Sequence, residues 1–87
     1  MKILCVCGLG QGTSLILRMN VEEVLNDMGI RADVDNTDVS SASSEVSDFI
    51  ITNKVLSSEI ANDTPRIIIE NYFDKEEIQK EIEKTIK

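Results

Sequence analysis

Short apolar runs alternate with longer mixed segments along this chain. Residues 2–6 (KILCV) are almost wholly apolar and show no alternation, which is typical of a strand buried on both faces of a parallel sheet. Three more strands are predicted, at residues 30–35, where apolar and polar residues alternate, and at residues 49–51 and 66–70, which are short apolar runs. Pro65, immediately before the last of these runs, fits the start of a strand.

Between these runs, apolar residues recur at helical spacing. In the longest helical segment they step by four, three and four residues, at Leu17, Val21, Val24 and Met28. Either Thr13 or Ser14 is expected to cap this helix, because a hydroxyl oxygen can accept from the unpaired amides of a first turn. Gly29 is expected to end the helix in a left-handed turn.

Weaker helical patterns follow in the second half of the chain. The serine-rich stretch 40–47 predicts a loop or a short, weak helix, and residues 55–61 predict another short helix. The final helical segment has apolar residues four apart, at Ile78, Ile82 and Ile86. Asp74 and Glu77, three residues apart, predict a capping box at its start.

The alternation of strand and helix predicts one α/β domain over residues 1–87, in which helices pack on a parallel sheet. In such sheets the ligand site lies at the carboxyl ends of the strands, near the point where the strand order reverses. The segment that follows the first strand, beginning at Cys7, is therefore expected at the functional edge.

Composition narrows the classes of function. The net charge is −7, with 16 acidic and 9 basic residues, which argues against a nucleic-acid partner because phosphate backbones need a basic face. No apolar stretch is long enough to span a bilayer, and Gly8 and Gly10 interrupt the first apolar run too early for a signal peptide. We therefore expect a cytoplasmic protein without direct membrane insertion.

The chain has two cysteines and no histidine. Cys5 and Cys7, one residue apart, are a poor disulfide framework, and a closed zinc site would need more ligands. We expect no metal and no cofactor. Cys5 lies inside the predicted strand and is expected in the core, where burial would raise the pKa of a thiol. Cys7 is the leading candidate nucleophile, because no imidazole is present for a covalent or acid–base step.

Cys7 stands where the first strand gives way to a glycine-rich segment, residues 7–12. A thiolate beside a helix N-terminus can have its pKa lowered from about 8.5 to roughly 3.5–7.5. The glycines of this segment are Gly8, Gly10 and Gly12. Their amides can approach an anion closely, and Thr13 and Ser14 could add hydroxyl donors. This arrangement suits chemistry on a phosphoryl group.

Three sharper motifs do not fit. The spacing Gly-x-Gly-x-Gly is one residue short of a dinucleotide fingerprint. A Walker loop needs Gly-Lys-Ser/Thr, but Thr13 follows Gly12 directly. A cysteine phosphatase would need an arginine where Thr13 stands. A loop without that arginine should hold a phosphoryl group without fast hydrolysis, as a phosphocarrier requires.

Residues 3–14 follow the pattern ILxxCGxGQGTS and continue as LILRM over 15–19. This segment resembles the enzyme IIB component of the bacterial phosphoenolpyruvate-dependent sugar phosphotransferase system (PTS), within the lactose/galactitol-like IIB superfamily. The ascorbate-type branch is the most similar, and there Thr13 replaces a serine and Arg18 a lysine. The resemblance implies a single EIIB type-2-like domain: a Rossmann-like, three-layer sandwich with a four-stranded parallel sheet.

The resemblance also implies a function. Cys7 would accept a phosphoryl group from a phosphohistidine on a IIA partner and pass it to a sugar bound by a membrane IIC partner. The sugar implied by the branch is ascorbate-like. The residues expected to bind the phosphoryl group through their amides are Gly8, Leu9, Gly10, Gln11, Gly12, Thr13 and Ser14. Gln11 is expected to contact the partner or substrate, whereas Arg18 would steer an anionic donor or be a solvated surface residue.

Three alternatives stay open at this point. The chain could be a phosphorylation-dependent regulatory module that binds a transcriptional regulator. It could also be a redox-reactive thiol protein that uses Cys5 and Cys7, or a small phosphatase, which the missing arginine disfavours.

Overall fold

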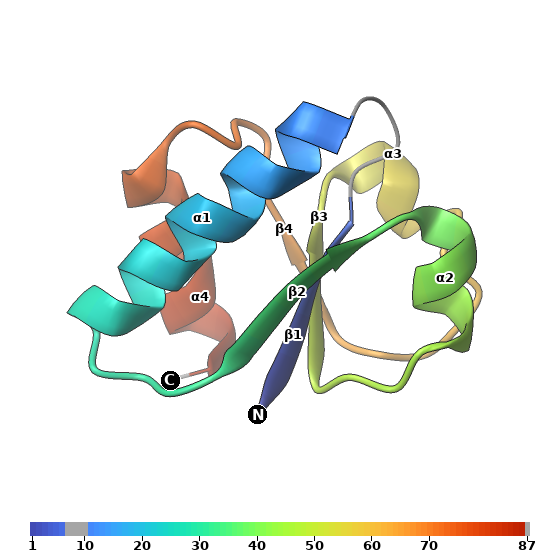
Figure 1. Cartoon of the computed structure of the whole chain (residues 1–87), viewed down its shortest axis with the longest axis horizontal. Helices are drawn as coiled ribbons and strands as arrows, with labels where there is room; N and C mark the ends of the chain where they lie inside the picture. Colours follow the sequence, from blue (N-terminus) through green and yellow to red (C-terminus); the bar gives the residue numbers. More distant parts are fainter. Residues whose placement is uncertain (7–10, 87) are drawn as a thin grey trace.

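The structure is a computed structural model that describes residues 1–6 and 11–86, with the backbone alone described for residues 11–14. Four parallel strands form one sheet in the order β2-β1-β3-β4, and helices lie on both of its faces (Figure 1). The elements are β1 (Lys2–Val6), α1 (Gln11–Asp27), β2 (Asp33–Thr37), α2 (Val39–Ser44), β3 (Phe49–Thr52), α3 (Lys54–Ser57), β4 (Arg66–Ile68) and α4 (Lys75–Ile86). The predicted α/β sandwich with a parallel sheet is confirmed.

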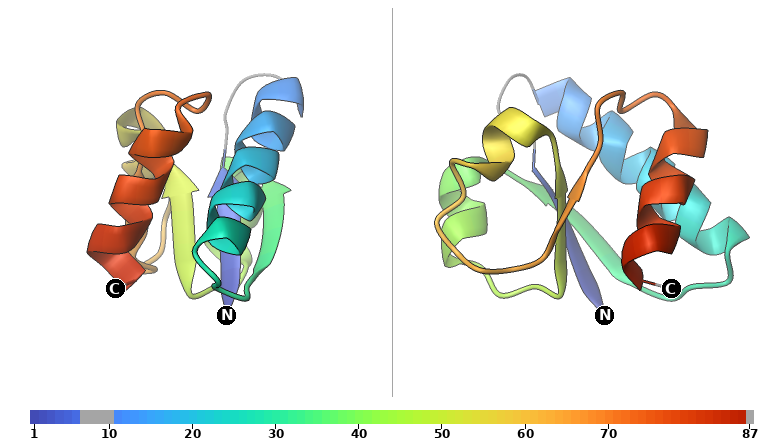
Figure 2. Two further views of the ribbon diagram at one scale, coloured as in Figure 1. Left: turned by 90° about the vertical axis from the view of Figure 1, so that its left-hand side faces the viewer. Right: turned by 180° about the vertical axis from the view of Figure 1, so that it is seen from behind.

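The apolar core is divided by the sheet into two parts. On one face Ile3, Cys5 and Ile51 pack with α1 and α4, which lie side by side (Figure 2). On the other face Leu4 and Ile50 pack with the α2 residue Ala42 and with Ile60. Successive residues of β1 thus serve opposite faces, and both faces are covered. This double coverage explains the unbroken apolar run at the start of the chain.

The start of α1 differs from the prediction. The helix begins at Gln11, so Thr13 and Ser14 lie inside its first turn and do not cap it. The predicted loop over residues 7–12 therefore overlaps the helix by two residues. A hydroxyl residue suits a cap but is also compatible with a first turn, so the two hydroxyl residues do not by themselves fix where the helix begins.

The end of α1 follows the prediction. Gly29 has φ +73°, its amide donates to the Asn26 carbonyl at 3.1 Å, and the Ile30 amide donates to the Leu25 carbonyl at 2.9 Å. These two bonds form a Schellman motif, which satisfies carbonyls at the end of the helix. Glycine suits this position because a side chain at positive φ would strain the backbone.

The second strand is displaced from its predicted position. β2 covers Asp33–Thr37 and not residues 30–35, because Ile30 is used in closing the helix. Pairing begins only where β1 offers a partner: the Asp33 amide donates to the Met1 carbonyl at 2.8 Å, and the ladder then runs from Lys2↔Asp33 onward. The register against β1, a tertiary constraint, fixes this strand.

Two of the remaining predictions need correction. The short helix predicted over 55–61 is α3, Lys54–Ser57, and its cap is Asn53, whose side chain accepts from the Leu56 amide at 2.8 Å. The strand predicted over 66–70 ends at Ile68, because its partner β3 ends at Thr52. The serine-rich stretch, left as loop or helix, contains the six-residue helix α2.

The last helix buries Ile78 and Ile82, as predicted. Asp74 caps it by accepting from the amides of Glu76 and Glu77 at 3.0 and 3.2 Å. A capping box would also have the Glu77 side chain accept from the Asp74 amide, and this part of the prediction is wrong. The Glu77 carboxylate accepts instead from the amides of Glu70 and Asn71 at 2.7 and 3.1 Å. Glu77 therefore fixes the connection between β4 and α4.

Candidate functional site at the carboxyl edge of the sheet

The strand order reverses between β1 and β3. From β1 the chain proceeds through α1 to β2 on one side, and then crosses through α2 to β3 on the other side of β1. The carboxyl ends of β1 and β3 flank this switch point, where ligands bind in open α/β sheets. Val6 is the last residue of β1, so the segment that begins at Cys7 leaves the sheet at this point.

A buried hydroxyl joins the two strands at this edge. The Thr52 hydroxyl donates to the carbonyl oxygen of Val6 at 2.9 Å, and both residues are fully buried. The last paired residues of the β1–β3 ladder are Cys5 and Ile51, so this bond lies one residue beyond the ladder. Sequence reasoning did not single out Thr52, although a hydroxyl at the end of a buried apolar strand was the available signal.

The predicted phosphate-binding residues fall into two groups. Cys7, Gly8, Leu9 and Gly10 lie outside the described residues. The backbone of Gln11, Gly12, Thr13 and Ser14 forms the first turn of α1. Amides in the first turn of a helix have no intrahelical acceptor, and the helix dipole places partial positive charge there. The first turn of this 17-residue helix contains no acidic residue, so no carboxylate of that turn opposes an anion.

Arg18 is engaged within the protein. Its Nε lies 3.0 Å from the Glu22 carboxylate, and its Nη1 donates to the Asn36 side-chain oxygen at 3.1 Å. The residue therefore ties α1 to the edge strand β2. Neither expectation for Arg18, donor steering or simple solvation, included this structural contact.

Cys5 lies in the core, as expected. Its side chain is 0% exposed and belongs to the cluster that includes Leu17 of α1 and Ile78 of α4. A thiol in this position is out of reach of a bulky reagent or a partner protein as long as the fold is intact.

Asp38 is an acidic group at the same edge, directly after β2. The hydrogen bond from the Ser41 amide, at 2.7 Å, lowers the pKa of its carboxyl below the ordinary value of 3.8. The cause is the capping of α2 by this carboxylate, so the shift reflects local helix structure. Among the described residues, no group of three His, Cys, Asp or Glu side chains could hold a metal ion.

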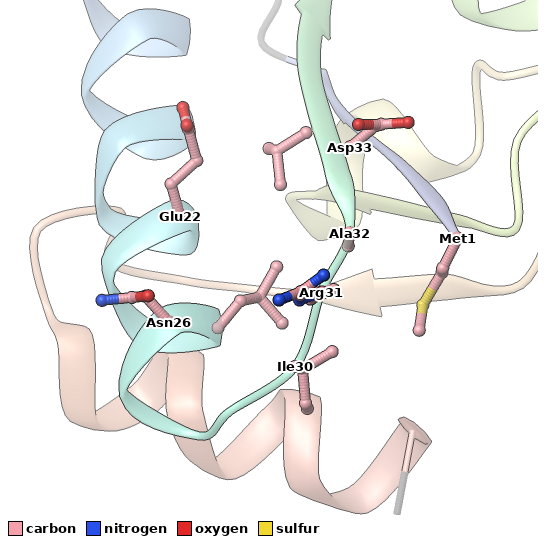
Figure 3. A pocket seen from close by; sticks show the side chains of 9 residues that line it. Met1, Glu22, Asn26, Ile30, Arg31, Ala32 and Asp33 are labelled. Carbon is pink, nitrogen blue, oxygen red and sulfur yellow. The ribbon is translucent and has the colours of Figure 1, made fainter.

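A separate groove lies away from the carboxyl edge. A groove of about 560 Å³ runs between the end of α1 and the start of β2, lined among others by Met1, Asn26, Arg31 and Asp33 (Figure 3). These residues belong to the last turn of α1, to the connection before β2, and to the amino ends of β2 and of the chain before β1. The groove contains none of the predicted site residues.

Large apolar side chains are exposed near the carboxyl edge. On α1 they are Leu15, Ile16 and Met19, and Phe73 is exposed just before α4. We call these four residues the α1–Phe73 surface. Met19 and Phe73 are 57% and 66% exposed, and a hollow of about 420 Å³ lies beside them, lined by Met19, Asn20, Glu22, Glu23 and Lys75. The Lys75 ammonium forms an ion pair with Glu23 across this hollow.

The fold defines a small doubly wound α/β domain, in which Val6 at the end of β1 lies at the switch point. Residues 2–84 match the protein-family model described as "PTS system, Lactose/Cellobiose specific IIB subunit". The chain belongs to this family. The resemblance found in the sequence is thereby confirmed.

Individual relatives carry another sugar in their names. The chain is 41% identical over 61 residues to the ascorbate-specific PTS system EIIB component of Shigella sonnei, which covers 68% of this chain and 60% of that protein. It is 39% identical over 62 residues to the component of the same name from Salmonella typhimurium, covering 69% and 61%. The matches thus span about three fifths of the length of these relatives.

A solved structure shares the fold. The lactose-specific IIB component domain from Streptococcus pneumoniae superimposes with a TM-score of 0.62 and covers 99% of this chain and 94% of that one, at 19% identity. In the described part of the present chain, no helix combines the length and the apolar composition needed to cross a membrane.

Proposed function

We propose that this chain is a phosphocarrier of a sugar-uptake phosphotransferase system, with Cys7 as the residue that carries the phosphoryl group. The observation that carries the proposal is the family match over residues 2–84, supported by the position of Val6, the residue before Cys7 in the sequence, at the switch point. In this proposal the donor is a phosphohistidine of a IIA protein and the acceptor is a sugar held by a membrane IIC protein. The carrier works on the cytoplasmic side of that membrane.

The chemistry consists of two displacements at phosphorus. The Cys7 thiolate attacks the phosphohistidine; an S–P bond forms while the P–N bond breaks, and the imidazole nitrogen takes the electron pair. A sugar hydroxyl then attacks the phosphocysteine; an O–P bond forms, the S–P bond breaks, and the thiolate returns. The hydroxyl proton passes to a base at the acceptor site. No electrons are gained or lost overall.

The protein contributes positioning and local charge. Amides of residues 8–14 hold the phosphoryl oxygens, and the partial positive charge at the start of α1 lowers the pKa of the thiol. The position where a cysteine phosphatase has its arginine is Thr13, so water attack on the phosphocysteine gains no comparable help. The phosphoryl group can then persist until the acceptor arrives.

The sugar in this proposal is ascorbate-like. Support comes from the names of the relatives at 39–41% identity, which are more similar in sequence to this chain than the lactose-specific domain at 19% is. A transport assay with radiolabelled ascorbate and lactose, using the matching IIC proteins, distinguishes the two.

The α1–Phe73 surface is proposed to contact the protein partners. Its α1 residues follow directly after the carrier segment along the chain, and all of its residues are large, apolar and exposed. Apolar residues at the centre of an interface, such as Met and aromatic side chains, supply much of the binding energy between proteins. A IIA protein must bring its phosphohistidine to Cys7, so it must cover this neighbourhood.

Two other functions are less well supported. A redox role for the two cysteines would require Cys5 to reach the surface, but Cys5 is fully buried. A regulatory module that binds a transcriptional regulator would use the same phosphocysteine with a different recipient. A regulatory module can be distinguished from a carrier by experiment: it does not pass its phosphoryl group to sugar.

The test is intact-mass analysis after incubation with phosphoenolpyruvate, the general relay proteins and a phosphorylated IIA. Wild type is compared with Cys7→Ser and with Cys5→Ala, the matched control at a cysteine two residues away. One added phosphoryl group on wild type and on Cys5→Ala, absent on Cys7→Ser, is the expected result. An unmodified wild type beside verified phosphorylated IIA would refute the carrier role. Addition of sugar and IIC should then discharge the adduct, whereas a regulatory module would keep it.

A further inference from the structure

We propose that Thr52 is a positioning residue for the phosphoryl-carrying segment, acting through its hydrogen bond to Val6. The inference rests on the proposed function of Cys7. It assigns a role to a residue of β3 that lies 46 positions from its bonding partner along the chain and outside the glycine-rich motif.

Thr52 links the carboxyl ends of three strands. Its hydroxyl donates to the Val6 carbonyl of β1 at 2.9 Å, and its own carbonyl accepts from the Ile69 amide, just after β4, at 2.9 Å. The next residue, Asn53, caps α3. Through this one residue, the end of β1 is joined to β3 and to the segment that follows β4.

The hydroxyl is needed for the bond rather than for packing. Thr52 is 0% exposed and is the buried polar residue of the core in the described part of the chain. A hydroxyl in such a place is costly unless it is hydrogen-bonded, and valine would fill nearly the same volume without that cost. The contact with the Val6 carbonyl therefore accounts for a threonine at this position.

The bonded carbonyl belongs to the peptide group that joins Val6 to residue 7. A peptide group is planar, so a hydrogen bond to its oxygen also restrains the orientation of its nitrogen. The hydrogen bond from β3 therefore acts on the last peptide group before the carrier segment. Transfer between proteins needs the attacking sulfur in line with phosphorus, and small displacements of a reacting group slow such steps strongly.

The test uses Thr52→Val, which removes the hydroxyl at nearly constant volume, and Thr52→Ser, which keeps it. The matched control is Thr85→Val: the Thr85 hydroxyl also donates to a backbone carbonyl, that of Glu81 at 3.0 Å, but within α4. Two readouts are taken below the melting temperature of every variant. They are the rate of phosphoryl uptake from phosphorylated IIA, and the pH dependence of Cys7 alkylation by iodoacetamide, located by fragment mass analysis.

For Thr52→Val we expect uptake slowed roughly tenfold and the midpoint of the alkylation profile moved upward, toward the ordinary thiol value of about 8.5. Thr52→Ser and Thr85→Val should stay close to wild type in both. A Thr52→Val protein that matches wild type in uptake and in alkylation overturns the proposal, as does a Thr52→Ser protein impaired equally. If Thr52→Val does not fold, Thr52→Ser is compared with Thr52→Ala, and equal alkylation profiles for these two overturn it.

The measurements distinguish an error in this inference from an error in the proposed function. If wild type takes up no phosphoryl group, the carrier role is wrong, and the alkylation profiles still decide whether Thr52 orients Cys7. If wild type is phosphorylated but the hydroxyl makes no difference, only the positioning role is wrong.

Discussion

The Asn20 side-chain amide of α1 donates to the backbone carbonyl of Tyr72 at 2.8 Å. This bond joins residues 52 positions apart and ties the middle of α1 to the connection between β4 and α4. Each partner is followed or preceded by an exposed apolar residue: Met19 stands before Asn20, and Phe73 stands after Tyr72. The hydrogen bond therefore joins the α1 part of the α1–Phe73 surface to the segment that carries Phe73.

A charge placed on this surface should weaken the encounter with the phosphoryl donor. We expect Met19→Lys and Phe73→Lys each to raise the KM for phosphorylated IIA roughly fivefold or more, because truncating or charging a central apolar contact commonly costs above about 1 kcal/mol. Single-turnover uptake at several IIA concentrations measures this change.

The matched control for those substitutions is Val46→Lys. Val46 is 89% exposed but lies between α2 and β3, where the chain approaches the amino end of the sheet. Its KM should equal that of wild type. An equal rise for all three variants would indicate a general charge effect and would contradict a specific docking surface. Cys7 alkylation should be unchanged in every variant.

The capping contact of Asp38 predicts a pH dependence of stability. The pKa of its carboxyl is lowered from 3.8 in the folded chain by the Ser41 amide. A group whose folded pKa is lowered stabilises the fold above its unfolded pKa, and this contribution is lost as the pH falls through the folded pKa. We expect wild type to lose more stability than Asp38→Asn between about pH 5 and about pH 2, because asparagine can cap without titrating.

Urea unfolding at each pH measures this difference, with Asp63→Asn as a control at another exposed carboxylate. A loss of stability in Asp38→Asn as steep as in wild type would show that other carboxylates account for the acid sensitivity.

The two cysteines should respond oppositely to substitution. Cys5→Ser places a hydroxyl among apolar side chains, and we expect the free energy of unfolding to fall by about 1–3 kcal/mol. Cys7→Ser should change that free energy little and abolish the phosphoryl adduct. Urea denaturation followed by circular dichroism, together with intact mass, measures both effects. A stable Cys5→Ser protein that takes up no phosphoryl group would contradict the assignment of Cys5 to the core.

Much of the fold follows from local pattern. The apolar run Lys2–Val6, the stripe of α1 and its end at Gly29 were predicted because each depends on neighbours in sequence. Side chains four residues apart share a helix face, and a glycine after the last apolar position permits the left-handed turn. Such features can therefore be predicted from the sequence alone.

Errors arose where a boundary depends on a partner element. β2 was predicted three residues too early because its first pair is set by Lys2, and β4 was predicted too long because β3 ends at Thr52. Glu77 was assigned to its own helix cap, although its carboxylate reaches the amides of Glu70 and Asn71. The spacing of residues along the chain does not reveal these contacts between separate elements.

By itself the sequence determined the class of protein and the candidate nucleophile: the strand, the glycine-rich turn and the helix that surround Cys7 are contiguous, so the motif is readable residue by residue. Only the tertiary structure decided that Arg18 is held by Asn36 of β2 and that Thr52 reaches Val6. Each of these contacts joins residues from two different elements. The second exists because the sheet order brings the carboxyl ends of β1 and β3 together, where burial makes the hydroxyl take a specific partner.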